Sequence, residues 1–232
     1  MNTVLRFIKN EFTGWKRWEI SYIAACTIAI GIIAAYLGDT ALGIASAITG
    51  TLYTMFAGKG KISCYIFGMF NTAAYGYIAF SQKIYGDMML NWLIYFPMMF
   101  AGIILWNHRR DEQHTIIKTL LSWKKRLYLL LLNIFAIAVY AVILHRLGAI
   151  QPAVDSCTTV LSVTAMILTL KRCIEQWLLW TAVNLLSVVM WCRVYFSSGG
   201  ESPATLLWWI IMLVSGIIFY VQWRASINKV NN

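Results

Sequence analysis

The 232-residue sequence is poor in charged residues, in proline and in paired cysteines. Only 12% of its residues are charged, whereas 60% are hydrophobic, and this balance excludes an ordinary soluble globular domain. Its three prolines leave long apolar runs uninterrupted, and its eleven tryptophans are typical of aromatic belts at membrane surfaces. The composition therefore predicts an all-α integral membrane protein.

The five cysteines are scattered and form no C-x-x-C pair, so neither a metal site nor a disulfide framework is indicated. They are interpreted as small buried hydrophobic residues: Cys26, Cys64, Cys157, Cys173 and Cys192. The sequence also lacks the H-E-x-x-H, G-x-S-x-G and G-x-x-x-x-G-K-[ST] motifs of hydrolases and ATP-driven proteins. We therefore expect no enzyme activity, no metal and no cofactor.

Eight apolar segments approach the roughly 20 residues that a membrane-spanning helix needs. They are expected at 18–38, 40–57, 62–82, 86–107, 127–146, 150–170, 173–193 and 203–223. The segment 40–57 is short and follows the first segment almost directly. A count of seven spanning helices therefore stays open.

Basic residues fall mainly in alternate connections between these segments. If eight helices alternate across a membrane, 16 of the 19 lysines and arginines lie on one side. Because cytoplasmic loops are enriched in these residues, the bias places both termini in the cytoplasm and explains the net charge of +10 without a nucleic-acid partner. Residues 1–17 are basic and amphipathic and are expected to lie on the anionic cytoplasmic leaflet.

The sequence contains a weak internal repeat. Residues 59–71 align without a gap on residues 172–184, which places Asn71 opposite Asn184. Both copies begin on the cytoplasmic side, so the pattern predicts a parallel repeat with three helices in each half. Transporters built from such repeats bind substrates near the membrane midplane, at the repeat interface. The alternative explanation is a chance match.

The segment 175–191 reads EQWLLWTAVNLLSVVMW and is apolar enough to span a bilayer, yet it contains Gln176 and Asn184. At 3.6 residues per turn, Trp177, Trp180 and Asn184 share one helix face. An asparagine amide both donates to and accepts from a carboxamide, and an indole face attracts a flat cation by about 0.5–2 kcal/mol. This face therefore favours a planar, polar-edged heteroaromatic ligand.

Residues 155–191 closely resemble the nicotinamide riboside transporter (PnuC) family, and residues 62–80 resemble the matching helix of the first half. The family patterns W-x-x-W-x-x-x-N and F-G-x-x-N fall on residues 177–184 and 67–71. The resemblance implies facilitated diffusion of nicotinamide riboside across the bacterial inner membrane, with trapping by cytoplasmic phosphorylation. It also implies a homotrimer and a fold of two three-helix bundles, similar to the SWEET sugar transporters.

That fold implies a division of the whole chain. A linker helix joins two parallel three-helix bundles, an additional N-terminal helix precedes them, and basic cytoplasmic segments complete the chain. The expected boundaries are 1–17 for the amphipathic stretch, 18–38 for the additional helix, 39–107 for the first bundle, 108–126 for a basic loop, 127–146 for the linker helix, 147–224 for the second bundle and 225–232 for the tail.

One departure from the family concerns the fourth segment. Family members often read P-M-Q-F there, whereas this chain has Pro97, Met98, Met99 and Phe100 and lacks the glutamine. The missing amide leaves thiamine or a riboflavin-like vitamin as alternative cargo. A vitamin sensor that binds without transporting is a further alternative.

The residues expected to bind the substrate are Asn71, Trp177, Trp180, Asn184, Phe67, Gln176 and Asp155. The centre of the site is expected to consist of Asn71, Trp180 and Asn184. Each assignment has a structural alternative. An asparagine also serves as an interhelical contact, Trp177 could belong to an interfacial belt, and Gln176 could be a cap or interfacial amide. Asp155 is most simply a solvent-exposed carboxylate, with binding of ribose hydroxyls as the minor alternative.

Overall fold

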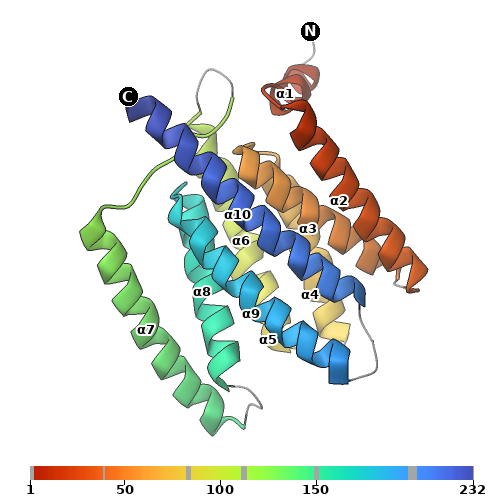
Figure 1. Cartoon of the computed structure of the whole chain (residues 1–232), viewed down its shortest axis with the longest axis vertical. Coiled ribbons are helices and arrows are strands. Elements are labelled where there is room, and N and C mark those ends of the chain that lie inside the picture. The colour runs from red at the N-terminus through yellow and green to blue at the C-terminus, as the bar shows by residue number, and fades with distance from the viewer. Residues whose placement is uncertain are drawn as a thin grey trace. The chain divides into compact units, whose positions relative to one another are not determined.

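The computed structural model describes residues 3–38, 40–81, 85–110, 114–148, 152–197 and 203–231, and their regular structure is helical (Figure 1). In chain order the elements are α1 (Thr3–Glu11), α2 (Arg17–Tyr36), α3 (Ala41–Lys59), α4 (Cys64–Ser81), α5 (Tyr85–Met89), the π-helix η1 (Leu90–Tyr95), α6 (Phe96–Asn107), α7 (Trp123–Arg146), α8 (Pro152–Leu170), α9 (Glu175–Ser197) and α10 (Pro203–Asn231). The prediction of an all-α protein is confirmed.

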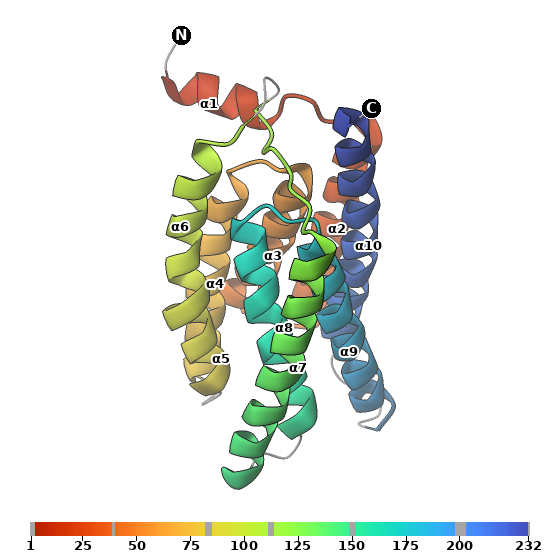
Figure 2. The same ribbon diagram turned by 90° about the vertical axis from the view of Figure 1, so that its left-hand side faces the viewer.

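The chain divides into two compact units, Met1–Ile117 and Lys118–Asn232. In the first unit, α3 packs against α2 and α4, and α4 packs against α6. In the second unit, α8 packs against α7 and α9, and α9 packs against α10 (Figure 2). Each unit therefore contains a helical hairpin, α3–α4 or α8–α9, with a further helix, α6 or α10, packed on its second member.

Six helical segments in the described part of the chain are long and apolar enough to cross a membrane by length and composition. They are Arg17–Tyr36, Ala41–Lys59, Asp87–Asn107, Trp123–Arg146, Pro152–Leu170 and Leu206–Asn228. These segments match six of the eight expected ones. The other two, 62–82 and 173–193, are helical as α4 and α9. The count of eight spanning helices stays a prediction.

The two hairpins turn in the same way. Gly60 (φ 75°) and Arg172 (φ 60°) take the left-handed conformation just beyond the ends of α3 and α8. Glycine suits this position because it has no Cβ to clash with the backbone. The same pair of helix-ending backbone hydrogen bonds then follows in both hairpins: the N–H groups of Gly60 and Lys61 donate to Ala57 and Phe56, and those of Arg172 and Cys173 donate to Thr169 and Leu168.

These bonds correct the register of the internal repeat. Each recurs 112 residues later rather than 113, and so do the first bonds of the next helix, in which Cys64 and Tyr65 correspond to Gln176 and Trp177. The prediction that Asn71 matches Asn184 is therefore wrong by one residue, and Asn184 corresponds to Thr72. Burial agrees, because Thr72 and Asn184 are both less than 8% exposed. Turn hydrogen bonds set where a helix begins, whereas a shared asparagine can arise by chance.

The predicted segment 86–107 is not one regular helix, because α5 passes through the π-helix η1 into α6. Pro97 is the second residue of α6. Proline has no N–H, and its ring clashes with the carbonyl four residues earlier, so a wider helical turn before it relieves the clash. Within η1, the buried Asn91 donates its amide to the carbonyl oxygen of Asp87 at 2.9 Å.

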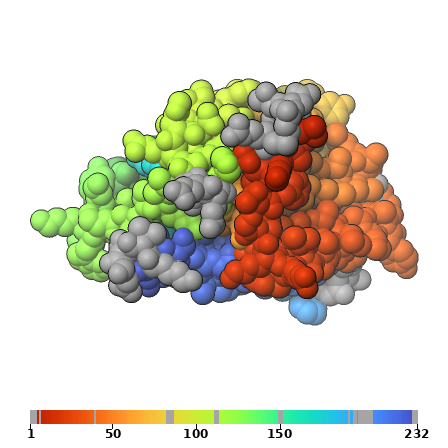
Figure 3. All heavy atoms as spheres, turned by 90° about the horizontal axis from the view of Figure 1, so that it is seen from above, coloured from red at the N-terminus to blue at the C-terminus, as the bar shows by residue number. Residues whose placement is uncertain are grey.

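The N-terminal helix α1 lies on the surface of the first unit (Figure 3). Its one-turn spacing places Leu5, Ile8 and the following Phe12 on one face, where they are exposed by 59%, 48% and 61%. Glu11, by contrast, is only 2% exposed. One side of α1 is therefore fixed to the unit, and an apolar side is left uncovered by the described residues.

Candidate functional site

The candidate site in the second unit is one face of α9. Gln176 and Trp177 lie in the first turn, Trp180 follows one turn later, and Asn184 lies a further turn along the helix. Gln176, Trp177 and Asn184 are 1%, 3% and 7% exposed, and Trp180 is half-buried. The structure therefore places Trp177, Trp180 and Asn184 on one largely buried side of α9, as their spacing predicts, with Gln176 next to them.

Several polar groups on this face have unused hydrogen-bonding capacity. The side-chain nitrogens of Gln176 and Trp177 are fully buried and have no partner among the described residues. The amide of Asn184 lies further along the same face and is also buried, at 7% exposed. A buried polar group without a partner costs about 1–3 kcal/mol. This face therefore favours a bound polar molecule that supplies the missing partners.

Trp177 does not offer a free ring face. Its indole packs on Phe219 and Trp223 of α10, with ring centroids 5.1 and 5.7 Å away. Burial also excludes the alternative of an exposed interfacial belt for Trp177, and it excludes an exposed interfacial amide for Gln176. Trp177 is therefore part of an aromatic core, and only its N–H edge is available for binding.

Trp180 is the better stacking residue. Its Nε1 donates to Thr169 Oγ1 of α8 at 3.4 Å, which is long for a hydrogen bond. Thr169 in turn donates to the carbonyl oxygen of Ala165 at 2.9 Å. Among the described residues, no aromatic ring stacks on Trp180. The bond to Thr169 holds the edge of the indole, so a planar ligand would have to stack on the ring face.

Phe67 and Asn71 belong to the first unit and lie on α4. The Asn71 Nδ2 donates to the carbonyl oxygen and hydroxyl of Ser46 on α3, at 2.8 and 3.2 Å. Phe67 packs on Phe56 with ring centroids 5.1 Å apart. Both contacts hold the α3–α4 hairpin together. The side-chain N–H group of Asn71 therefore serves as an interhelical contact, which is the structural alternative to substrate binding. Its Oδ1 keeps its accepting capacity among the described residues.

Asp155 lies apart from the α9 face. It is exposed and occupies the first turn of α8, whereas Thr169, the contact of Trp180, lies 14 residues further along the same helix. At 1.5 Å per residue, the two positions are about 21 Å apart along α8. The ordinary explanation, an exposed carboxylate at a helix start, therefore fits the structure.

A surface hollow of about 650 Å3 lies further along α9 and includes none of the seven predicted residues. It is lined by Val188, Val189, Cys192, Arg193 and Phe196. The hollow is open and almost entirely apolar, so it provides no convergent polar groups for a small ligand. The α9 face remains the candidate site because its polar groups are buried and unpaired.

The sequence did not single out three buried or bonded residues that lie next to predicted ones within the same unit. Ser187 is 4% exposed, and it lies three residues after Asn184, so helical periodicity could have identified it. Thr169 and Ser46, the partners of Trp180 and Asn71, come from other helices. No local pattern identifies a partner that is supplied by a different helix.

Known proteins similar to this chain place it in a transporter family. Residues 40–225 match the family model described as nicotinamide mononucleotide transporter. The nicotinamide riboside transporter PnuC of Neisseria mucosa is 31% identical over 223 residues, covering 94% of this chain and 85% of the relative. The chain belongs to the PnuC family. The nicotinamide riboside transporter PnuC of Haemophilus influenzae is 29% identical, and the match covers 99% of this chain and 100% of the relative.

A solved PnuC structure extends the likeness to three dimensions. The chain matches the structure titled "Crystal structure of the Vitamin B3 transporter PnuC" with a TM-score of 0.84 and 31% identity, covering 97% of this chain and 98% of that one. PnuC membership, together with the six apolar helices, makes the chain a multi-pass inner-membrane protein of a transporter family. The family resemblance of the sequence is confirmed.

Proposed function

We propose that this PnuC-family chain carries nicotinamide riboside across the bacterial inner membrane by facilitated diffusion. The observation that carries the proposal is the α9 face, where the side-chain nitrogens of Gln176 and Trp177 are buried without partners among the described residues and Asn184 is buried on the same face. The names of the curated relatives, which are riboside transporters, support the same substrate.

The chemistry of the face favours the riboside over the mononucleotide named by the family model. Between Glu175 and Cys192, α9 contains no lysine or arginine. A phosphate bound there would receive from α9 itself none of the charge-assisted hydrogen bonds that phosphate sites use. The cationic pyridinium of the riboside instead suits the indole ring of Trp180. Its carboxamide suits Asn184, which both donates and accepts.

The proposed architecture is two parallel three-helix bundles joined by a linker helix, as in SWEET transporters. The first bundle comprises α3, α4 and the α5–η1–α6 segment, within 39–107. The second comprises α8, α9 and α10, and it extends beyond the predicted boundary at 224 because α10 continues as one helix to Asn231. The recurrence of the hairpin turns at an offset of 112 supports the repeat. In this scheme α7 is the linker helix and α2 is the additional N-terminal helix.

The proposed orientation places both termini in the cytoplasm, with α1 on the anionic inner leaflet. The exposed apolar residues Leu5, Ile8 and Phe12 would enter the lipid interface. A homotrimer is part of the proposal, and α7 is suited to contacts with lipid or another copy. Only 6% of the 18-residue apolar stretch of α7 is buried within the chain.

The proposed mechanism is alternating access by movement of the two bundles, with the substrate held at the α9 face by Trp180 and Asn184. The chain shows no nucleotide-binding motif for energy coupling. Substrate therefore drives the conversion only by its different affinity for the two states. Cytoplasmic phosphorylation of the cargo would keep net flux inward.

The test is a binding and transport panel with the purified full chain. Equilibrium binding is measured for nicotinamide riboside, nicotinamide mononucleotide, thiamine and riboflavin, and radiolabelled counterflow is measured in liposomes. We expect nicotinamide riboside to bind most tightly and to exchange. If thiamine or riboflavin binds most tightly, that vitamin is the cargo. This is the alternative that follows from Met98 and Met99, where the family's glutamine is missing. Tight binding without counterflow would instead indicate a sensor.

A further inference from the structure

In each unit, a buried glutamate lies against the start of the helix that bears candidate site residues. Glu11 is 2% exposed and Glu175 is 6% exposed. Neither belongs to the proposed substrate site. Buried carboxylates need ionic and hydrogen-bonding partners, and both glutamates find them in segments that are distant along the chain.

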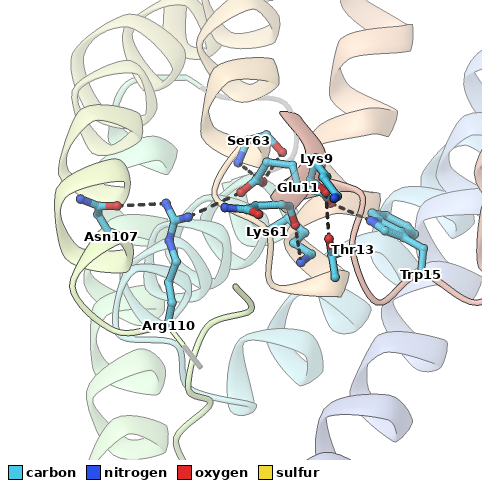
Figure 4. Close-up of polar contacts among 9 residues, drawn as sticks. Lys9, Glu11, Thr13, Trp15, Lys61, Ser63, Asn107 and Arg110 are labelled. Atoms are coloured by element: carbon cyan, nitrogen blue, oxygen red, sulfur yellow. Dashed lines mark hydrogen bonds and ion pairs between the residues drawn. The ribbon is translucent and has the colours of Figure 1, made fainter. Parts of the chain in front are cut away.

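In the first unit, Glu11 joins three segments (Figure 4). Its Oε2 accepts hydrogen bonds from the backbone N–H and the hydroxyl of Ser63, at 2.9 and 2.7 Å, immediately before α4. Its Oε1 lies 3.7 Å from the guanidinium of Arg110, three residues beyond the end of α6. Arg110 is itself held to Asn107 at 3.0 Å. Glu11 therefore links the end of α1, the start of α4 and the end of α6.

In the second unit, Glu175 forms an equivalent junction. Its Oε1 accepts from the backbone N–H of Leu121 at 3.0 Å and from the guanidinium of Arg126 at 2.8 Å. Arg126 lies in the first turn of α7. Glu175 therefore links the start of α9, the segment before α7 and α7 itself.

The two junctions occupy the same place in the repeat. At the offset of 112, Glu175 corresponds to Ser63, the residue that Glu11 binds. In the second unit the carboxylate belongs to the first residue of α9, whereas in the first unit Glu11 of α1 supplies the carboxylate that binds the start of α4. In both units an arginine from the segment between α6 and α7, or from the first turn of α7, completes the junction.

We infer that Glu11 and Glu175 are matched positioning residues that make each unit move as one body during transport, and this inference rests on the proposed function. The substrate-facing side chains of α9 are held by other contacts, such as the packing of Trp177 on Phe219. Loss of a junction therefore leaves substrate affinity intact. It loosens α6 or α7 from the site-bearing helix and slows the conversion between states.

The test compares Glu11→Gln and Glu175→Gln with a matched control, Glu19→Gln. Glutamine keeps an acceptor for the backbone N–H but removes the charge. Glu19 is equally buried and pairs with Lys59 at 2.6 Å, but it joins α2 to α3. In liposomes, each junction variant should lower the counterflow rate of nicotinamide riboside about fivefold or more, with its Kd within about twofold of the original chain. Glu19→Gln should change neither quantity.

A second measurement follows the junction without substrate. Trypsin should cleave after Lys118, Lys124 or Lys125 about threefold faster in Glu175→Gln than in the original chain or in Glu19→Gln. Glu175→Asp, which keeps the charge, should recover most of the counterflow rate. Unchanged counterflow, or a rate that falls only in proportion to a weakened Kd, would overturn the inference. Failure of the original chain to bind nicotinamide riboside would reject the proposed function, and the trypsin result would then decide the junction alone.

Discussion

Trp180 and Thr169 join the two helices of the α8–α9 hairpin, with the indole N–H of Trp180 donating to Thr169 Oγ1 at 3.4 Å. The bond holds the indole by its edge, and no ring among the described residues covers its face. This arrangement separates two roles of one side chain. The N–H orients the ring, and in the proposed site the ring face would stack on the ligand.

Substitutions at Trp180 should distinguish these roles. Trp180→Ala is expected to weaken binding of nicotinamide riboside by about 0.5–2 kcal/mol, because the stacking face for the pyridinium is lost. Trp180→Phe, which keeps a ring, should lose less. Thr169→Val removes the acceptor but not the ring, and it should leave the Kd close to that of the original chain. Calorimetric titration measures all three, and equal losses in Trp180→Phe and Trp180→Ala would argue against stacking.

Asn184→Ala should weaken binding by about 1–3 kcal/mol, because a polar group of the ligand would be left unpaired in a buried site. Leu185→Ala is the matched control, since Leu185 is the neighbouring residue on α9 and is 51% exposed. Titration of the two folded variants measures the difference. Unchanged affinity in Asn184→Ala would remove Asn184 from the site.

Asp155→Asn should leave substrate affinity within about twofold of the original value, because Asp155 is exposed and lies apart from the α9 face. The measurement is the same titration, with the counterflow rate alongside. A large loss of affinity would show instead that Asp155 contacts the ribose hydroxyls.

Gly50→Ala should destabilise the first unit by about 1–3 kcal/mol, through overpacking against Asn71. A Cβ at Gly50 would lie 2.8 Å from Asn71 Nδ2, which is already bonded to Ser46. Gly31→Ala is the control, because its Cβ would meet Ile48 at an ordinary 3.6 Å. Thermal unfolding in detergent measures both variants. Equal melting temperatures would show that Asn71 moves aside without loss.

The repeat shows where inference from the sequence reached its limit. The similarity of the two hairpins was visible in the sequence, but the matched asparagines set the register one residue too far. The left-handed residues Gly60 and Arg172 fix the true register. Glycine favours this conformation but arginine does not, so the second turn gave no local sign of its position.

The sequence by itself determined the apolar segments, the helical class and the shared face of Trp177, Trp180 and Asn184. These features depend on hydrophobicity and on the 3.6-residue period, which are properties of the local chain. Only the tertiary structure decided that Asn71 bonds to Ser46, that Trp177 is packed within an aromatic core, and that Glu11 serves α4 from a separate helix. Each of these depends on which distant side chain supplies the partner for a buried group, and that choice is made by packing between helices rather than by sequence spacing.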